Sequence, residues 1–351
     1  MDTEKITIED VLWSITDRCN LNCIYCSVAA KDSSKSSKEI TPEESEIIIS
    51  KLSSLPKLNS LIISGGEVTL VRNIGHLLEQ ASHLARSIYI ISNGYQMPAP
   101  FLDAVKFHRP TVMITIDALD EEISRITRGP RVLENALQTI EVLKLHEIEI
   151  VVISVVTKLN IETLSESMIH LYSRGIRNFL LQQLHCEGRT SRELFNSLSP
   201  THDMIAKLYS ELTRIEDLYP DIYIDYNEIC FFNRREKVYN EKCVKGINYK
   251  PYRLFMCGAG TKFIAIKTNG DVIPCNALQE CILGNLYKDE VNAIFNSIES
   301  HNLKNLTDYR VNSISGCRGC TYEPVCDGGC RADVIHAFGD PFQKHPYCPN
   351  N

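Results

Sequence analysis

Short apolar segments alternate with longer amphipathic ones through the first two-thirds of the chain, and this alternation limits the fold more than any other feature. Six segments rich in β-branched residues are predicted strands: Val11–Thr16, Leu61–Ser64, Ile88–Ser92, Val112–Asp117, Ile148–Thr157 and Phe179–Leu184. Helical periodicity is found between them, at Pro42–Leu55, Ile74–Leu84, Ala99–Val105, Val132–Leu145 and Glu162–Tyr172. Strand–helix repeats predict a parallel sheet with helices outside it. Right-handed crossovers curve such a sheet, or close it into a barrel, with the active face at the carboxyl ends of its strands.

Composition excludes several classes of protein. The chain has 351 residues, of which 44% are hydrophobic and 23% charged, as in a globular protein with a large core. A net charge of −7 argues against nucleic acid as a partner, and no apolar segment is long enough to cross a membrane. The charged N-terminus does not resemble a signal peptide, so we expect a cytoplasmic protein. Its 14 cysteines then indicate metal binding more than disulfides.

The stretch Cys19-Asn20-Leu21-Asn22-Cys23-Ile24-Tyr25-Cys26 directly follows the first predicted strand. Its three thiols can close around one metal centre, because a chain that leaves a strand end can curl back at this spacing. Three thiolates are one fewer than the usual ligand set of an iron–sulfur cluster. One iron of a four-iron cluster would therefore keep an open position for a small molecule. Zinc sites also use closely spaced cysteines, so zinc remains an alternative at this point.

A second signal is Ser64-Gly65-Gly66-Glu67, directly after the second predicted strand. Two glycines without Cβ atoms let the backbone come close to a ligand, and Glu67 could accept hydrogen bonds from an ammonium group. A Gly-Gly pair is also typical of a loop that needs positive φ angles, so a purely structural role is the alternative.

The pattern changes near residue 250, where the helical segment predicted from Ser199 to Met256 ends and only short strands are predicted, at Phe263–Lys267 and Asp271–Ile273. Cysteines are closely spaced in this region: Cys257-x12-Gly270-x4-Cys275, then Cys317-x2-Cys320-x5-Cys326-x3-Cys330 and, after seventeen residues, Cys348. Free surface thiols at this density would be prone to oxidation. They are better explained as ligands of two metal centres, either zinc or iron–sulfur.

The CxxxCxxC and Gly-Gly-Glu motifs together resemble those of the radical S-adenosylmethionine (SAM) enzymes. In that family the open iron of a [4Fe-4S] cluster binds SAM, and reductive cleavage gives a 5′-deoxyadenosyl radical that abstracts a substrate hydrogen. The resemblance implies cluster ligands at Cys19, Cys23 and Cys26, an adenine contact at Tyr25, and contacts to the methionine amino group at Gly65, Gly66 and Glu67. The family usually has proline after this glutamate, where this chain has Val68.

Polar residues near the ends of the next predicted strands fit the same site. Ser92-Asn93 closes the third strand and Asp117 the fourth, Arg128 is followed by glycine as in many relatives, and Ser154 lies in the fifth strand. The resemblance implies that these residues contact SAM. Each of them alone is also typical of a cap or turn.

The C-terminal cysteines resemble the SPASM extension of radical SAM enzymes, which holds two auxiliary [4Fe-4S] clusters. The resemblance implies an outer cluster held by Cys317, Cys320, Cys326 and Cys348, and an inner cluster held by Cys257, Cys275 and Cys330. Some relatives have a fourth inner ligand where this chain has Phe263. The inner cluster therefore either recruits Cys243 or Cys281 or keeps an iron open.

The resemblance implies an α/β fold, namely a partial (β/α)6 TIM-like barrel followed by a small cysteine-rich SPASM domain. Its expected parts are the barrel at 1–205, a helical bridging segment at 206–256 and the SPASM domain at 257–351. The implied cofactors are SAM and three [4Fe-4S] clusters. A reduced flavodoxin or a ferredoxin-type protein would supply electrons.

Auxiliary clusters can accept an electron from a substrate radical, which favours net oxidation of a substrate. Enzymes with the SPASM extension mostly act on peptides or proteins, so the resemblance implies oxidative modification of a peptide or protein, by a thioether or carbon–carbon cross-link. The alternatives are a radical enzyme of small-molecule or cofactor biosynthesis, such as a decarboxylase or dehydrogenase, and a non-catalytic iron–sulfur or zinc protein.

Three further positions bear on the reaction. The first strand begins near residue 11, which leaves no room for a leader-binding domain, so a peptide would need a separate leader-binding protein or direct docking. Asn276 stands where formylglycine-forming relatives have an aspartate base, which argues against that reaction. Cys186 follows the sixth strand and is a candidate hydrogen donor, although a buried, inert thiol is the simpler interpretation.

Overall fold

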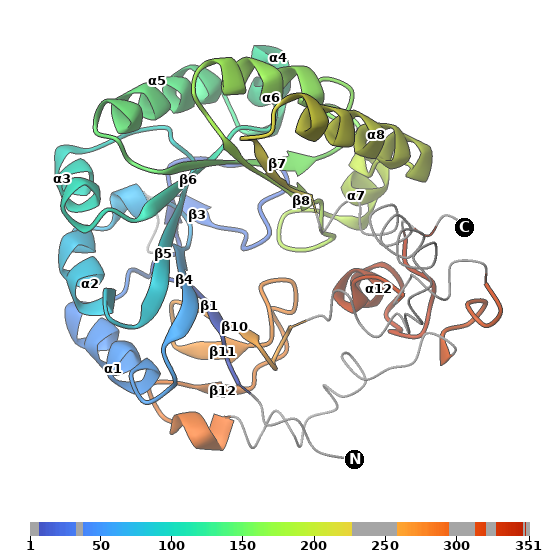
Figure 1. The fold of residues 1–351 in the computed structure, drawn as a ribbon. Coiled ribbons are helices and arrows are strands. Elements are labelled where there is room, and N and C mark those ends of the chain that lie inside the picture. Colours follow the sequence, from blue (N-terminus) through green and yellow to red (C-terminus); the bar gives the residue numbers. More distant parts are fainter. Residues whose placement is uncertain are drawn as a thin grey trace, which may run out of the picture.

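The structure, a computed structural model, describes residues 7–32, 38–226, 258–294, 313–320, 328–346 and 348. Its centre is one curved sheet of ten strands in the order β12-β11-β10-β1-β4-β5-β6-β7-β8-β9 (Figure 1). The strands are β1 (Asp10–Ser14), β4 (Leu58–Ser64), β5 (Ala85–Ser92), β6 (Thr111–Thr115), β7 (Ile150–Val156), β8 (Asn178–Gln183), β9 (Tyr223–Asp225), β10 (Phe263–Ile266), β11 (Asp271–Ile273) and β12 (Gly284–Asn285). All six strands expected from the sequence form, and they pair in parallel from β1 to β8. This is the expected α/β, TIM-like partial barrel.

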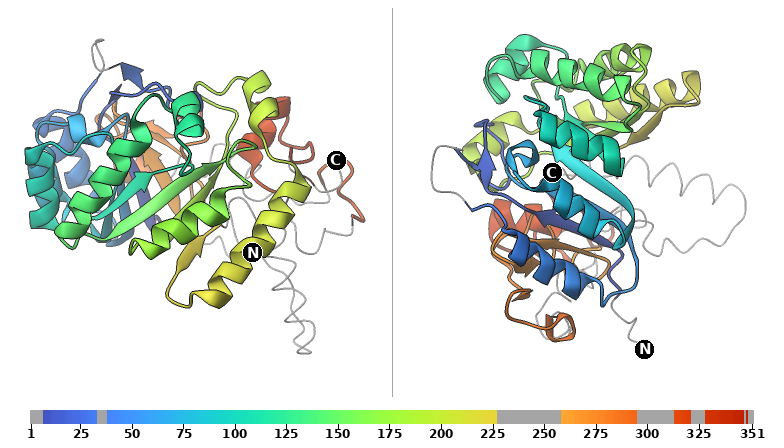
Figure 2. Two further views of the ribbon diagram at one scale, coloured as in Figure 1. Left: turned by 90° about the horizontal axis from the view of Figure 1, so that it is seen from above. Right: turned by 90° about the vertical axis from the view of Figure 1, so that its left-hand side faces the viewer.

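Helices cover the convex side of the sheet (Figures 1 and 2). The outer ring comprises α1 (Pro42–Leu52), α2 (Ile74–Ala81), α3 (Ala99–His108), α5 (Val132–Leu145), α6 (Leu164–Ser173) and α8 (His202–Leu218). The shorter α4 (Glu121–Thr127) and α7 (Arg192–Leu198) follow β6 and β8, and α12 (Arg331–Phe338), near the C-terminus, lies inside this ring. The predicted start of α1 is confirmed, because Thr41 and Glu44 form a reciprocal capping box with Pro42 in the first turn.

Apolar side chains on both faces of the strands explain why this sheet is stable. In β6, Val112 and Ile114 are fully buried, and Met113 and Thr115 on the opposite face are also buried. Parallel strands that are covered on both faces need such nearly continuous apolar sequences. α5 contributes one apolar stripe, which includes Ala136, Ile140 and Leu143 at helical spacing. The core therefore lies between the sheet and its helices.

Two strands correct the expected layout. β9 lies in the segment that was predicted to be helical from Ser199 to Met256, and it pairs in parallel with β8. Ile224 in β9 and Ile222 directly before it are buried, and burial at the sheet edge outweighs helix formation once α8 has ended. β10, from the cysteine-rich part of the chain, pairs in parallel with β1. The sheet thus runs across the domain boundary that we expected near residue 257.

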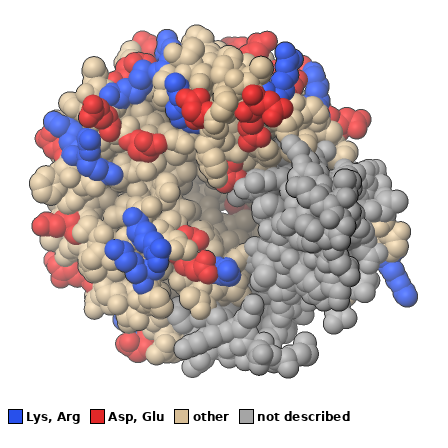
Figure 3. All heavy atoms as spheres, viewed as in Figure 1, with Lys and Arg blue, Asp and Glu red and all other residues tan. Residues whose placement is uncertain are grey.

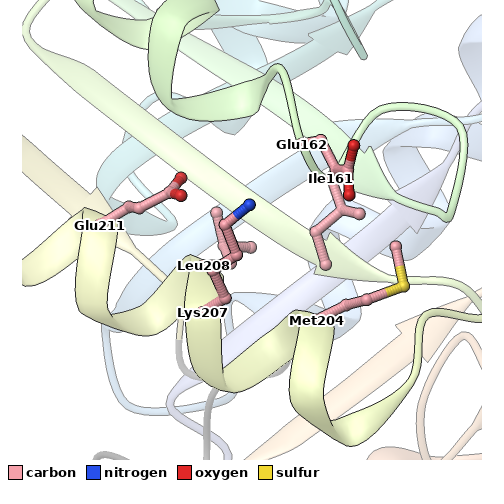
Figure 4. Close-up of a pocket in the computed structure, with 6 residues that line it drawn as sticks. All are labelled: Ile161, Glu162, Met204, Lys207, Leu208 and Glu211. Carbon is pink, nitrogen blue, oxygen red and sulfur yellow. The ribbon is translucent and has the colours of Figure 1, made fainter.

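Two pockets are lined by residues of helices and loops outside the sheet. A small one of about 20 Å³ lies on the helical side, lined by Ile161, Glu162, Met204, Lys207, Leu208 and Glu211 (Figure 4). It has room for about one water molecule. A larger cavity of about 360 Å³ opens beside the three-cysteine loop. On the face drawn in Figure 3 the surface is hollowed near its middle, and acidic and basic side chains are interspersed without forming one basic patch.

Candidate active site

The three-cysteine loop begins where β1 ends and is closed by a short parallel pair, β2 (Arg18–Cys19) with β3 (Lys31–Asp32). Cys19 is buried, and Cys23 and Cys26 are half-buried free thiols. Backbone N–H groups point at the sulfurs, from Leu21 to Cys19 Sγ at 3.4 Å and from Ala30 to Cys26 Sγ at 3.3 Å. Such N–H···S contacts are a standard way in which proteins tune an iron–sulfur cluster.

The electrostatics of the loop fit an iron–sulfur cluster. Burial, with smaller contributions from the charges of Glu67, Cys23 and Cys26, raises the pKa of Cys19 to about 12. Burial also raises the pKa of Cys23, while the Arg128 charge lowers it. Thiols in this position ionise only when a cation compensates them, and metal coordination provides that cation. Among the described residues, no three Cys, His, Asp or Glu side chains meet at a point that would hold a single metal ion.

The Gly65-Gly66 pair after β4 packs against the chain that enters this loop. Gly66 N–H donates to Thr16 O at 2.7 Å, and Glu67 N–H donates to Arg18 O at the same distance. A Cβ atom on Gly66 would lie 2.1 Å from Arg18 O, and one on Gly65 would lie 2.4 Å from Thr16 O. The glycines are therefore required by contact with the protein's own backbone, whatever ligand they also approach.

Glu67 and the end of β5 form one buried hydrogen-bonded unit. The Glu67 carboxylate accepts from Thr69 N–H at 3.0 Å, from the Ser92 hydroxyl at 2.8 Å and from Asn93 N–H at 2.8 Å. Burial raises the pKa of Glu67, and these hydrogen bonds counteract the shift. The Asn93 amide donates to Asn20 Oδ1 at 2.8 Å and lies 3.9 Å from Cys19 Sγ. The structure thus brings Glu67, Ser92 and Asn93 together beside Cys19.

A second buried unit lies beside Cys23. The Asp117 carboxylate accepts from the Tyr25 hydroxyl and from Arg128 Nε, and its Oδ1 atom accepts from Val155 N–H at 2.9 Å. Because Asp117 takes this strand N–H, β6 ends before the Asp117 that we expected it to include. Arg128 Nη1 lies 3.9 Å from Cys23 Sγ. Tyr25, Asp117 and Arg128 therefore meet at the loop.

Ser154, a predicted SAM contact, forms no side-chain hydrogen bond with either of these two units in the described structure. Its buried hydroxyl donates to Ile116 O of the neighbouring strand at 2.5 Å. This hydrogen bond within the sheet accounts for the hydroxyl.

The cavity of about 360 Å³ is the space next to the loop. Its walls are the loop itself, the last residues of α4 with the segment after it, and Tyr95: they comprise Asn20, Leu21, Asn22, Tyr95, Arg125, Ile126, Thr127, Arg128, Gly129 and Pro130. A cavity of this volume lies within the usual range for small-molecule sites. Arg128 and the three-cysteine loop share this cavity, so a ligand there would lie beside the cluster position.

The C-terminal cysteines are described in part, since Cys257 and Cys326 lie outside the described residues. Burial raises the pKa of Cys317, and the charges of Cys348 and Cys320 raise it further, so these three thiols are close neighbours. Cys275, Cys281 and Cys330 pack against one small apolar core of Ala277, Leu278 and Ala332. Burial is the cause of the raised pKa of Cys281. Gly270 of the expected motif forms the turn between β10 and β11 with φ +84°.

Sequence reasoning missed a buried polar network between β8 and α12. Asp333 is fully buried and contacts His185 Nδ1 at 2.7 Å, His345 Nε2 at 3.4 Å and the Gln183 amide. Burial alone would raise the pKa of Asp333, but His185 and His345 lower it. Neither end of the network belongs to a local sequence motif. Only the alternation of buried and exposed residues along β8 could have placed Gln183 on its buried face.

The neighbouring Cys186 and Glu187 differ in their contacts. The Cys186 thiol donates to Thr190 O at 3.8 Å and packs against the main core, which accounts for it without a catalytic role. Glu187 is 7% exposed, and its Oε2 atom has no hydrogen-bond partner in the described structure.

The fold and this site define a class: a barrel protein with a three-thiol cluster loop and a cysteine-rich extension. The radical SAM superfamily matches residues 13–171, and an iron–sulfur cluster-binding (SPASM) domain matches residues 257–321. The chain therefore carries a radical SAM domain and, after it, a SPASM domain. No described helix is long and apolar enough to cross a membrane.

Similar proteins differ in what they act on. The AdoMet-dependent heme synthase of Methanosarcina barkeri is 25% identical over 96% of this chain and 95% of its own length. The antilisterial bacteriocin subtilosin biosynthesis protein AlbA of Bacillus subtilis is 25% identical over 91% of this chain and 66% of its own length. Streptococcus suis SuiB, solved with its precursor peptide SuiA, has a TM-score of 0.75 and 16% identity over 98% of this chain and 76% of its own. This last likeness concerns the fold.

Proposed function

We propose that the protein is a radical SAM oxidoreductase whose SAM-binding cluster is held by Cys19, Cys23 and Cys26. The observation that carries this proposal is the placement of three free thiols on one loop beside the Glu67 and Asp117 units, near the carboxyl ends of β1, β4, β5 and β6. A [4Fe-4S] cluster with an open iron would supply the reductive cleavage of SAM.

The chain's own residues have distinct roles in this proposal. Gly65, Gly66 and Glu67 fix the backbone beside the methionine end of SAM, and Ser92 and Asn93 orient the Glu67 carboxylate. Asp117 holds Arg128 at the wall of the cavity of about 360 Å³, and it also accepts from the Tyr25 hydroxyl. An arginine in this position can attract the SAM carboxylate. We assign Ser154 a supporting role in the sheet.

We further propose two auxiliary [4Fe-4S] clusters, for three clusters in all. The ligands would be Cys317, Cys320, Cys326 and Cys348 for the outer cluster, and Cys257, Cys275 and Cys330 for the inner one. These clusters would accept the electron that leaves an oxidised substrate, and a flavodoxin or ferredoxin-type donor would reduce the SAM-binding cluster.

The substrate that we propose is a peptide, presented directly or by a separate leader-binding protein and modified by a thioether or carbon–carbon cross-link. Support comes from AlbA and from the precursor peptide bound to SuiB. A small molecule is the second candidate, because the heme synthase of M. barkeri matches 96% of this chain and 95% of its own length.

The test is SAM cleavage by protein prepared without oxygen and reduced with dithionite. We expect 5′-deoxyadenosine from the wild-type protein and none above background from Cys23→Ala. The matched control is Cys186→Ala, which leaves the cluster loop intact and should keep the cleavage activity. Equal product from Cys23→Ala and wild type would refute the proposal.

To choose between substrates, candidate peptides encoded beside the gene are co-expressed with the enzyme and analysed by mass spectrometry. A loss of two hydrogens that depends on Cys23 indicates oxidation of a peptide. An unchanged peptide together with a modified tetrapyrrole or other small molecule favours the second candidate.

A further inference from the structure

The loop between β8 and α7 touches the three-cysteine loop along its backbone. Gly188 has φ +61°, and a Cβ atom there would lie 2.3 Å from both Cys26 O and Ser27 O. Backbone atoms cannot yield to such a clash as the end of a flexible side chain can. Only glycine allows the two loops to approach this closely.

Arg189, the next residue, binds three carbonyl oxygens of the cysteine loop. Its backbone N–H donates to Cys26 O at 3.0 Å, its Nη1 atom donates to Cys23 O at 3.4 Å, and its Nη2 atom donates to Ala30 O. The Arg189 side chain thus holds the carbonyls of Cys23 and Ala30, and its backbone N–H holds that of Cys26. The planar, five-donor guanidinium group is suited to this task, and an ammonium group is not.

Two arginines, Arg128 and Arg189, contact the three-cysteine loop, and their charges lie in different surroundings. Arg128 is neutralised by the buried Asp117. In the described part of the chain, the polar partners of Arg189 are carbonyl oxygens, and no carboxylate lies within 4.0 Å of it. Its positive charge is therefore available to a negatively charged neighbour.

We infer that Arg189 is a positioning residue for the SAM-binding cluster, which fixes the cysteine loop and raises the cluster's reduction potential. This inference rests on the proposed function. A cluster with three thiolate ligands becomes more negative when it is reduced, and a nearby cation favours the reduced form. The hydrogen bonds hold the loop in place with or without iron, so the two effects are separable.

Three variants separate charge from geometry. Arg189→Gln removes both, whereas Arg189→Lys keeps the charge and loses the fork of donors. Arg192→Gln is the matched control, because this arginine lies three residues further on and donates to His336 O at 3.2 Å.

The first measurement is a redox titration of the SAM-sensitive EPR signal in protein loaded with iron and sulfide. We expect the midpoint potential of Arg189→Gln to be more negative than that of the wild type, Arg189→Lys to lie near the wild type, and Arg192→Gln to be unchanged. A potential in Arg189→Gln equal to that of the wild type would overturn the electrostatic part.

The second measurement is amide hydrogen exchange of residues 20–30 in metal-free protein, which does not depend on the cluster. Exchange should be faster in both Arg189→Gln and Arg189→Lys, and unchanged in Arg192→Gln. Unchanged exchange in both Arg189 variants would overturn the positioning role.

A glycine pair tests the close approach of the loops. Gly188→Ala should lower the iron content, whereas Gly339→Ala should not, since Gly339 has a similar φ of +73° but no atom within 4 Å of an added Cβ. Equal iron contents would contradict the inference. A wild-type protein without any SAM-sensitive EPR signal would instead refute the proposed function, so the two failures are distinguishable.

Discussion

Single buried residues, above all two acids, determine how the site is held. Asp117 has an exposed side-chain fraction of 3% and joins Arg128, Tyr25 and the N–H of Val155. Glu187 is buried nearly as well, but its Oε2 atom lacks a hydrogen-bond partner in the described structure. Asp117 thus has an ion-pair partner and several hydrogen bonds, whereas burial opposes ionisation of Glu187.

For Asp117→Asn we expect a loss of about 3–5 kcal/mol in the free energy of unfolding, because the Arg128 charge stays buried without its partner. Urea denaturation of the metal-free protein measures this loss. The control is Glu122→Gln, which removes an exposed ion pair with Arg125 and should leave the midpoint unchanged. Equal midpoints for the two variants would show that the Asp117 pair does not stabilise the fold.

For Glu187→Gln we expect a changed dependence of stability on pH. Burial raises the pKa of Glu187 to about 7, the charge of His185 lowers it, and the charge of Asp333 raises it. Since the folded-state pKa exceeds the unfolded one, the stability present below pH 4.5 is lost as the pH rises through 7, by up to about 3 kcal/mol. The variant should lose this decline and be more stable than the wild type at pH 8. Parallel pH curves of the melting temperature would contradict this expectation.

Local elements were predictable from the sequence, but contacts between distant segments were not. The helix expected at Val132–Leu145 forms with these bounds, because its apolar stripe and length suffice to define it. The pairing of β10 with β1 joins residues about 250 positions apart, and no local periodicity encodes it. α4, α7 and the His185–Asp333 contact were missed for related reasons, as short helices and long-range polar pairs leave weak local signals.

The glycine pair could be recognised from the sequence, but its packing against the backbone of the same chain could not. We gave ligand approach and a loop with positive φ angles as the two explanations of the glycines. The structure shows Gly65 with φ +147° and both glycines packed against Thr16 and Arg18 of the same chain. Candidate cluster cysteines are easier to propose from the sequence than candidate SAM contacts, because thiol spacing is a local property and pocket geometry is not.

Gly66→Ala should disrupt the contact between the loop after β4 and the cysteine loop. The added Cβ would lie 2.1 Å from Arg18 O, so one of the two backbones must move. We expect a lower iron content and a lower melting temperature. Gly75→Ala in α2 is the control: its Cβ would make an ordinary 3.5 Å contact, and it should stabilise the protein by about 0.5–1 kcal/mol. Full iron loading of Gly66→Ala would contradict the packing role.

At the scale of the whole molecule, the cysteine-rich part of the chain completes the barrel sheet. β10 covers the edge of β1, and the Asp333 network ties α12 to β8. Barrel and extension therefore share one sheet and one buried polar network. The clusters that we propose for the two parts would then be held in a fixed arrangement.

A chain that ends at residue 256 should for this reason fail to form a stable monomer. Without β10, the edge of β1 next to the fully buried Trp13 would present unpaired backbone groups to other chains. Size-exclusion chromatography should show aggregates, and circular dichroism should show a lower and broader melting transition than in the full chain. A monomeric truncated protein with an unchanged melting temperature would mean that β10 does not support the barrel.

The central claim is that the loop of Cys19, Cys23 and Cys26 holds a cluster with one iron open to SAM. EPR spectroscopy of the reduced protein, with and without SAM, tests it most directly. We predict that SAM changes the spectrum of one cluster in the wild type, and that Cys23→Ala loses this change along with about four of about twelve irons per chain. A fully loaded wild-type protein whose spectrum does not respond to SAM would contradict the account.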